Sequence, residues 1–233
     1  MKFLREITRK FKYNLKFLSK NKKIKLNYVA NSSSNSKLTE LMNFYGSDKG
    51  GRNNHHNYSE YYSELFFNER KNIKNFLEIG LGTNDVNMLS NMGEKGVPLA
   101  SLKAWRDYFD NAIIYGADID KKILKNHERI KTYFVDQTDP KTIELLFKNI
   151  GISDFDVILD DGLHEYNANI CLFENSIKFL SNSGIYIIED VYFKDKQKFI
   201  NYLNNSDYNY SIENKNDKKN IANNCIIDIR KKI

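Results

Sequence analysis

The stretch FDVILDDGLH, residues 155–164, joins a short apolar run to a cluster of polar residues. An apolar run of this length, bounded by polar residues, is typical of a buried parallel strand. A second run, residues 185–188, is followed directly by Glu189 and Asp190. Because ligands of open α/β sheets collect where parallel strands end, we expect these carboxylates and His164 to share one edge of a sheet.

The first run ends in two further carboxylates, Asp160 and Asp161. Carboxylates that crowd together raise one another's pKa unless something positive lies between them. A hard divalent cation with oxygen ligands would balance them. His164, three residues after Asp161, is then a candidate base beside a metal.

Apolar runs alternate with helical patterns along the rest of the chain. We predict helices near residues 38–46, 99–109, 140–150 and 166–180, and strands at 76–79, 113–117, 132–135, 155–159, 185–188, 208–212 and 225–229. This alternation predicts a parallel sheet with helices on both faces, and the last two strands form a closing hairpin. The expected fold is α/β, Rossmann-like and doubly wound, with a mostly parallel seven-stranded sheet and an N-terminal helical extension.

The start of the chain differs from its body in charge. Residues 1–30 hold ten basic residues and one acidic residue, and the rest of the chain is mildly acidic. Apolar residues recur there at three- and four-residue steps, which predicts an amphipathic helix, and the polar residues 31–36 read as a linker. We therefore divide the chain into residues 1–36 and a catalytic domain, 37–233. The basic helix would contact an anionic membrane surface peripherally, a partner or a second subunit, or would simply be solvated or packed on itself.

Several classes of protein are disfavoured by composition. The chain has no run of 18 apolar residues and no signal-peptide pattern, so we expect a cytoplasmic protein without a membrane span. The body lacks an obvious basic stripe, which argues against a nucleic-acid partner. Cys171 and Cys225 both lie in apolar runs and are expected to be free thiols. A homo-oligomer is expected.

Three predicted strands end in residues that suit a nucleotide-type cofactor. Glycines in EIGLGT, residues 78–83, allow close backbone approach to a ligand, although the third glycine of the dinucleotide fingerprint is missing. Asp118 ends the next strand and can accept hydrogen bonds from ribose hydroxyls. Its distance of 36 residues from Gly82 exceeds the usual spacing of roughly 20 and implies an insertion. Asp136 and Gln137 end the third strand, where they can read an adenine edge. Taken singly, each acid could be an ordinary strand-end cap.

The motifs EIGLGT, YGADID, VDQTD, DVILDDGLH and IIED, in this order, resemble those of class I S-adenosylmethionine-dependent methyltransferases. Together with YGSDK (residues 45–49), His56-x-Tyr58 and ASLKAWRDYF (residues 100–109), they resemble the metal-dependent sugar O-methyltransferases of macrolide glycosides and the related proteins labelled cephalosporin hydroxylase. The similarity covers about residues 38–192. Its most specific part is DDGxH followed by ED.

This resemblance implies S-adenosyl-L-methionine and Mg²⁺ as cofactors, and a sugar or glycoside as the acceptor. It implies that the metal is held by Asp161, Glu189 and Asp190, and that the catalytic residues are His164, as general base, and Asp161. It places the cofactor among Glu78, Gly80, Gly82, Ser101, Asp118, Asp136, Gln137 and Asp160. Leu163 stands where the sugar enzymes commonly have a small residue, which leaves the acceptor open. His56 and Tyr58 belong either to a lid or to a packed helix start, and Trp105 is expected in the core.

The implied chemistry is consistent with the residues. A sugar hydroxyl is a poor nucleophile, and chelation of two neighbouring oxygens by Mg²⁺ lowers the hydroxyl pKa and fixes its position. His164 can then accept the proton. Two alternatives are a hydroxylase, for which the sequence offers no two-histidine-one-carboxylate triad, and a cofactor-binding partner protein without turnover.

Overall fold

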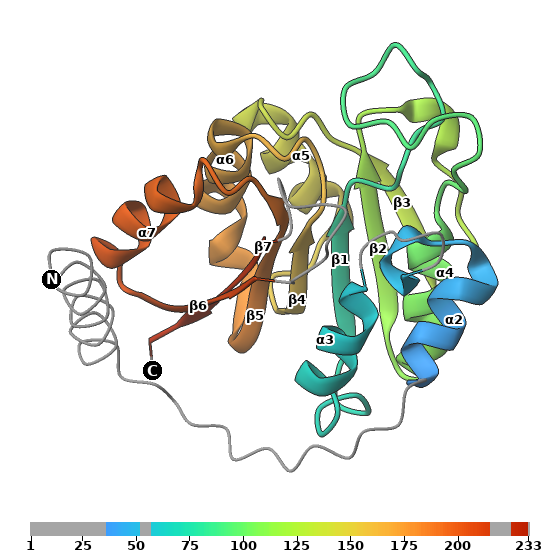
Figure 1. Ribbon diagram of the computed structural model, residues 1–233, viewed down its shortest axis with the longest axis horizontal. Coiled ribbons are helices and arrows are strands. Elements are labelled where there is room, and N and C mark those ends of the chain that lie inside the picture. The colour runs from blue at the N-terminus through green and yellow to red at the C-terminus, as the bar shows by residue number, and fades with distance from the viewer. Residues whose placement is uncertain (1–35, 52–56, 215–224, 233) are drawn as a thin grey trace, which may run out of the picture. The chain divides into compact units, whose positions relative to one another are not determined.

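A seven-stranded sheet forms the centre of the computed structural model, which describes residues 36–51, 57–214 and 225–232 (Figure 1). Its strands are β1 (Asn75–Ile79), β2 (Ile113–Asp118), β3 (Ile130–Phe134), β4 (Phe155–Asp160), β5 (Leu180–Val191), β6 (Tyr208–Asn214) and β7 (Cys225–Lys231). They lie in the order β3-β2-β1-β4-β5-β7-β6. The first five strands pair in parallel, and β7 pairs antiparallel with β5 and β6. The predicted doubly wound, mostly parallel sheet is therefore confirmed.

All seven predicted strands are present. The largest difference in bounds is at β5, which begins at Leu180 rather than at Ile185. Phe155 pairs with Leu180 ahead of a register shift, so the sheet extends into the polar residues before the apolar run. The helix predicted over residues 166–180 accordingly ends earlier.

The helices are α2 (Lys37–Tyr45), α3 (Tyr58–Leu65), α4 (Ala100–Tyr108), α5 (Pro140–Ile150), α6 (Tyr166–Ser176) and α7 (Lys196–Asn204), with 3₁₀ turns η1 (Asp48–Gly50), η3 (Lys121–Ile123) and η4 (Ile177–Phe179). The α5 helix has its predicted bounds because its ends carry strong local signals. The Asp139 side chain accepts a hydrogen bond from the Lys141 amide, Pro140 occupies the first turn, and Gly151 closes the helix in the left-handed conformation. The sequence did not predict α7, and offered α3 only as one of two alternatives.

Helices cover both faces of the sheet. The buried side chains of α2, α3 and α4 pack on one face, and those of α5, α6 and α7 pack on the other. Alternation along a strand separates the two cores, so that Phe76 belongs to the first core and Leu77 to the second. Among the described residues, no helix combines the length and apolar character that crossing a bilayer requires.

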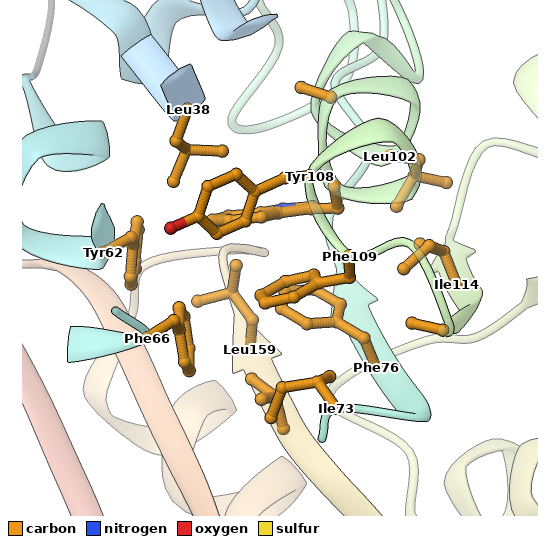
Figure 2. Close-up of a cluster of buried hydrophobic side chains, with 14 of the residues drawn as sticks. Leu38, Tyr62, Phe66, Ile73, Phe76, Leu102, Tyr108, Phe109, Ile114 and Leu159 are labelled. Carbon is orange, nitrogen blue, oxygen red and sulfur yellow. The ribbon is translucent and has the colours of Figure 1, made fainter. Parts of the chain in front are cut away.

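The first core is rich in aromatic rings, as Figure 2 shows around Tyr62, Phe66, Phe76 and Phe109. Trp105 is fully buried among them, which confirms its predicted place in the core. Its ring centroid lies 5.3 Å from that of Tyr62 and 4.9 Å from that of Phe76. These contacts hold α3 and α4 against β1. The predicted helix and linker of the first 35 residues, and His56, lie outside the described residues.

Candidate active site

A cavity of about 730 Å³ lies beside the carboxyl ends of β1, β2, β3 and β4. The sheet order reverses between β1 and β4, and this reversal is where doubly wound sheets bind ligands. The volume is within the range of small-molecule sites. The cavity is lined by the turn after each of these strands, by the segments around η1 and the start of α4, and by the loop before α4.

The two glycines after β1 have left-handed backbones, with φ of +90° at Gly80 and +75° at Gly82. A Cβ atom at Gly80 would lie 2.0 Å from the carbonyl oxygen of Asp161. At Gly82 it would lie 2.1 Å from the Met92 Cε atom. Glycine is therefore required at position 80 both by the turn and by the close contact between the β1 and β4 turns.

Asp118 lines the cavity and also fixes the glycine turn. Its Oδ2 atom accepts a hydrogen bond from the Leu81 amide at 2.7 Å, and its Oδ1 atom accepts one from the Asp120 amide at 2.7 Å. Burial raises the pKa of the Asp118 carboxyl, and these amide donors oppose the rise. Asp120 in turn accepts a hydrogen bond from Thr83 at 2.6 Å. The β2 end thus positions the β1 turn.

Asp160 lies beneath the cavity and does not line it. Its oxygens accept hydrogen bonds from the Gln137 side chain at 2.6 Å and from the Asn169 side chain at 2.8 Å. Gln137 lines the cavity, and its Oε1 atom accepts a hydrogen bond from the Leu163 amide at 2.8 Å. Both predicted cofactor residues therefore support the turn after β4. The sequence did not single out Asn169, which appeared only as a polar residue in a predicted helix.

Of the remaining predicted cofactor residues, two line the cavity and one is buried away from it. Ser101, in the first turn of α4, and Asp136, after β3, line the cavity. Asp136 accepts hydrogen bonds from the amide and hydroxyl of Thr138 at 2.9 and 2.7 Å. Glu78 is fully buried and does not line the cavity. Burial raises the pKa of its carboxyl to about 7.

A group of possible metal ligands lies at the wall of the cavity. One ligand atom from each of Asp161, His164 and Asp190 lies within 4.8 Å of the others. All three residues line the cavity. His164 and Asp190 have φ of +60° and +52°, backbone conformations that are uncommon for residues other than glycine. This group contains two of the three predicted ligands, and His164 takes the place of Glu189.

Glu189 is 1% exposed, and its two oxygens are both engaged. Its Oε1 atom accepts a hydrogen bond from the Tyr62 hydroxyl, and its Oε2 atom contacts Lys49 Nζ at 2.6 Å. Asp190 accepts a hydrogen bond from the Tyr58 hydroxyl. Tyr58 is 1% exposed and begins α3, so it is the packed helix start that was one of its two predicted alternatives.

Lys49 is the main residue of the site that sequence reasoning missed. Its Nζ atom also contacts Asp161 Oδ2 and lies 3.7 Å from Glu78 Oε1. Burial lowers the pKa of this ammonium, but attraction by Asp161 and Glu189 outweighs burial, and the pKa lies well above its ordinary value. Burial conversely raises the pKa of the Asp161 and Glu189 carboxyls, and Lys49 opposes the rise. The only signal for Lys49 was its place in the YGSDK motif.

A second cavity of about 430 Å³ adjoins the first. The two cavities share four lining residues, which are Leu89, Ser90, Leu163 and His164. The rest of its lining is aromatic, charged or, at one position, an amide: Glu165, Tyr166, Asn167, Tyr192, Lys194, Asp195 and Lys198. His164 therefore lies at the boundary between the two cavities.

Curated proteins that are similar in sequence are sugar-modifying O-methyltransferases. The 8-demethyl-8-alpha-L-rhamnosyl tetracenomycin-C 2'-O-methyltransferase of Streptomyces olivaceus is 31% identical over 154 residues, which are 66% of this chain and 37% of the relative. The mycinamicin VI 2''-O-methyltransferase of Micromonospora griseorubida is 30% identical over 158 residues, which are 66% of this chain and 36% of the relative. The chain thus spans less than two fifths of the length of these relatives. No protein-family profile matches it.

Solved structures show the same fold. The MycE methyltransferase of the mycinamycin pathway, in complex with Mg, SAH and mycinamycin VI, is 28% identical with a TM-score of 0.55, over 68% of this chain and 38% of that one. Another MycE structure, with Mg and SAH, covers 86% of this chain and 56% of that one with a TM-score of 0.64, at 21% identity. An O-methyltransferase from Bacillus cereus in complex with SAH covers 87% of this chain and 94% of that one, with a TM-score of 0.55 and 13% identity.

The sheet order, the glycine turn after β1 and the acidic strand ends agree with these similarities. The chain has the class I S-adenosylmethionine-dependent methyltransferase fold and is a relative of the macrolide-sugar O-methyltransferases.

Proposed function

We propose that this protein is an S-adenosylmethionine- and Mg²⁺-dependent O-methyltransferase that acts on a sugar hydroxyl of a surface glycan or a glycosylated metabolite. The observation that carries the proposal is a cavity that runs from the glycine turn after β1 to the group Asp161, His164 and Asp190. This cavity supports the proposal because a cofactor at the glycine turn and a cation at that group would lie in one continuous space. The sequence relatives are named as sugar O-methyltransferases, which supports the same reaction.

The cofactor would lie along the strand ends. Gly80 and Gly82 line the cavity with left-handed backbones and would present main-chain groups to the cofactor, and Asp118 would accept hydrogen bonds from ribose hydroxyls. Ser101 and Asp136 line the same cavity and would complete the polar contacts. We assign Glu78, Gln137 and Asp160 to supporting these residues from below.

The residues at the wall of the cavity fit a divalent cation. Carboxylate oxygens suit Mg²⁺, and ligands at about 2.1 Å from one ion lie within roughly 4.2 Å of each other. The atoms of Asp161, His164 and Asp190 lie within 4.8 Å of one another, so small side-chain rotations would close the site. When bound, the cation would lower the pKa of the acceptor hydroxyl and fix its position. We assign Asp161, Glu189 and Asp190 to the cation and His164 to the proton of the acceptor hydroxyl. His164 would accept this proton as the methyl group passes from the sulfonium sulfur to the hydroxyl oxygen, with S-adenosylhomocysteine as the leaving product.

The acceptor would enter from the second cavity, because His164 lines both spaces. Tyr166 and Tyr192 offer aromatic faces there, and Lys198 is paired with Asp195 at 2.7 Å. A lining of tyrosines, amides and balanced charges suits a polyhydroxylated, uncharged ligand. We therefore favour a hydrophilic sugar as the part of the acceptor that this cavity holds.

Two measurements test this function. Calorimetric titration of S-adenosylhomocysteine should show tight one-to-one binding, and the absence of binding with and without Mg²⁺ would reject the methyltransferase assignment. Incubation with S-adenosylmethionine and a panel of sugars carrying vicinal diols should then yield a product heavier by one CH₂ unit. Asp161→Asn is the matched inactive control.

The hydroxylase alternative has no structural support among the described residues. The possible metal group found there contains a single histidine, His164, whereas a facial iron triad needs two. A cofactor-binding protein without turnover would bind S-adenosylhomocysteine but give no methylated product with any sugar of the panel.

A further inference from the structure

Lys49 occupies the centre of the acidic cluster. Its side chain is 4% exposed, and it contacts carboxylates from three strands or strand ends: Glu78 of β1, Asp161 after β4 and Glu189 of β5. An isolated charge is rarely buried to this extent, so its partners must compensate it. The described residues place no second lysine or arginine in ionic contact with these carboxylates.

The contacts of Lys49 use the same oxygens that a metal would need. The Nζ atom lies on one oxygen of Asp161 and on one of Glu189, and the Tyr62 hydroxyl holds the other Glu189 oxygen. With Lys49 in this position, Glu189 has no oxygen free of a protein donor. Glu189 also lies outside the group of possible metal ligands, which consists of Asp161, His164 and Asp190.

We propose that Lys49 is an internal counter-cation that competes with the divalent cation for Asp161 and Glu189, and so sets the affinity of the metal site. The proposal rests on the proposed function, because it concerns the same cation. Two cations that share the Asp161 carboxylate repel each other even at the effective dielectric of a protein site. Binding of the divalent ion with Glu189 as a ligand therefore requires the ammonium to withdraw.

The position of Lys49 in the chain connects the possible metal ligands to the helical segment that packs over them. It lies in η1, between α2 and α3, and α3 supplies the Tyr58 and Tyr62 hydroxyls to the same cluster. The segment that covers this end of the first core is thus held to the sheet through the carboxylates that would bind metal. Lys49 is therefore a positioning residue, because it acts through the proposed metal ligands and touches no reacting atom.

The test is a direct measurement of metal affinity with Mn²⁺ as a spectroscopic substitute for Mg²⁺. The electron paramagnetic resonance signal of free Mn²⁺ is followed as each protein is added, without any acceptor. Lys49→Met should bind Mn²⁺ more tightly than the wild type, by on the order of tenfold or more. Lys49→Arg, which keeps the charge, should stay close to the wild type. Lys148→Met removes an exposed lysine from α5 and should change nothing.

The outcomes separate the two proposals. Equal or weaker Mn²⁺ binding by Lys49→Met, with wild-type affinity for S-adenosylhomocysteine, overturns the role of Lys49 and leaves the proposed function standing. Absence of Mn²⁺ binding in all variants overturns both the role of Lys49 and the metal dependence. If Lys49→Met does not fold, the double variant Lys49→Met with Glu78→Gln removes one positive and one negative charge, so the cluster keeps the net charge of the wild type. The same gain in Mn²⁺ affinity is expected of this double variant.

Discussion

Adjacent residues at the end of β4 have opposite orientations. Asp160 points beneath the turn and accepts hydrogen bonds from Gln137 and Asn169, whereas Asp161 lines the cavity. The alternation of side chains at a strand end produces this separation. Two chemically identical groups thus differ in position, one hydrogen-bonded beneath the turn and the other at the cavity wall, where we propose that it holds the cation.

Substitution of each aspartate by asparagine should separate these roles. Asp160→Asn replaces one carboxylate oxygen by an NH₂ group, which then faces the amide donor of Gln137 or Asn169. We therefore expect a loss of about 1–3 kcal/mol in the free energy of unfolding. Asp161→Asn should instead abolish Mg²⁺-dependent methyl transfer with S-adenosylhomocysteine binding retained. Chemical denaturation and methyl-transfer assays of both variants check this. A reversed pattern would show that the two side chains have been assigned the wrong way round.

Gly80 and Gly151 provide a matched pair of left-handed glycines. Gly151→Ala has open space around the new Cβ, and should cost only the backbone strain of about 1–3 kcal/mol. Gly80→Ala adds a collision with the Asp161 carbonyl, which belongs to the backbone and cannot rotate away. We expect a larger loss of stability and a loss of S-adenosylhomocysteine affinity. Thermal unfolding and calorimetry are the measurements, and equal effects of the two variants would contradict the account.

His164→Ala tests the assignment of the base. Loss of a general base typically lowers a rate by about 10² to 10⁴, and we expect a fall in this range. The affinity for S-adenosylhomocysteine should be retained, because His164 makes none of the proposed cofactor contacts. Single-turnover rates at saturating cofactor would measure the loss, and an unaltered rate would remove His164 from the mechanism.

At the scale of elements, α3 links the aromatic core to the acidic cluster. Its Tyr62 ring packs edge-on against Trp105, and its hydroxyl donates a hydrogen bond to Glu189. The sequence of α3 is rich in serine and glutamate, and its buried residues are three tyrosines and Ser59. This composition explains why the helix was predicted only as an alternative.

Two substitutions at Tyr62 should separate what its ring and its hydroxyl contribute to stability. Tyr62→Phe keeps the ring and loses the hydroxyl, and we expect a cost of about 1–3 kcal/mol because the buried Glu189 oxygen loses its donor. Tyr62→Ala also leaves a cavity in the core, and should cost about 3–5 kcal/mol. Urea denaturation distinguishes the two. A similar cost for both would mean that the ring contributes little to docking of α3.

At the scale of the whole molecule, the proposed cofactor residues and the possible cation ligands line one cavity but follow different strands. The cofactor would be held mainly at the ends of β1 to β3, and the cation would be held after β4 and by β5. Cofactor binding should therefore not require the metal. A chelator should abolish methyl transfer while the thermal stabilisation by S-adenosylhomocysteine persists. Loss of that stabilisation in the chelator would show that the metal is needed to form the cofactor site.

The sequence by itself determined the seven strands, the bounds of α2, α4 and α5 to within a residue, and the set of polar residues at the strand ends. These features depend on local signals: the length of apolar runs, the Asp139 and Gly151 caps of α5, and the order of the motifs. Parallel topology then brings the strand ends to one edge, so the region of the site could be predicted without coordinates.

Only the tertiary structure decided how those residues divide their roles. Lys49 lies 112 positions from Asp161 and 140 from Glu189 in the chain, and no local pattern predicts such a contact. The hydroxyls of Tyr58 and Tyr62 reach the cluster because of how α3 packs on the sheet, and the donors to Asp160 depend on where Gln137 and Asn169 lie beside β4. Burial favours these contacts, because a carboxylate removed from water is stabilised by a nearby donor or cation, and the packed chain determines which of them are near.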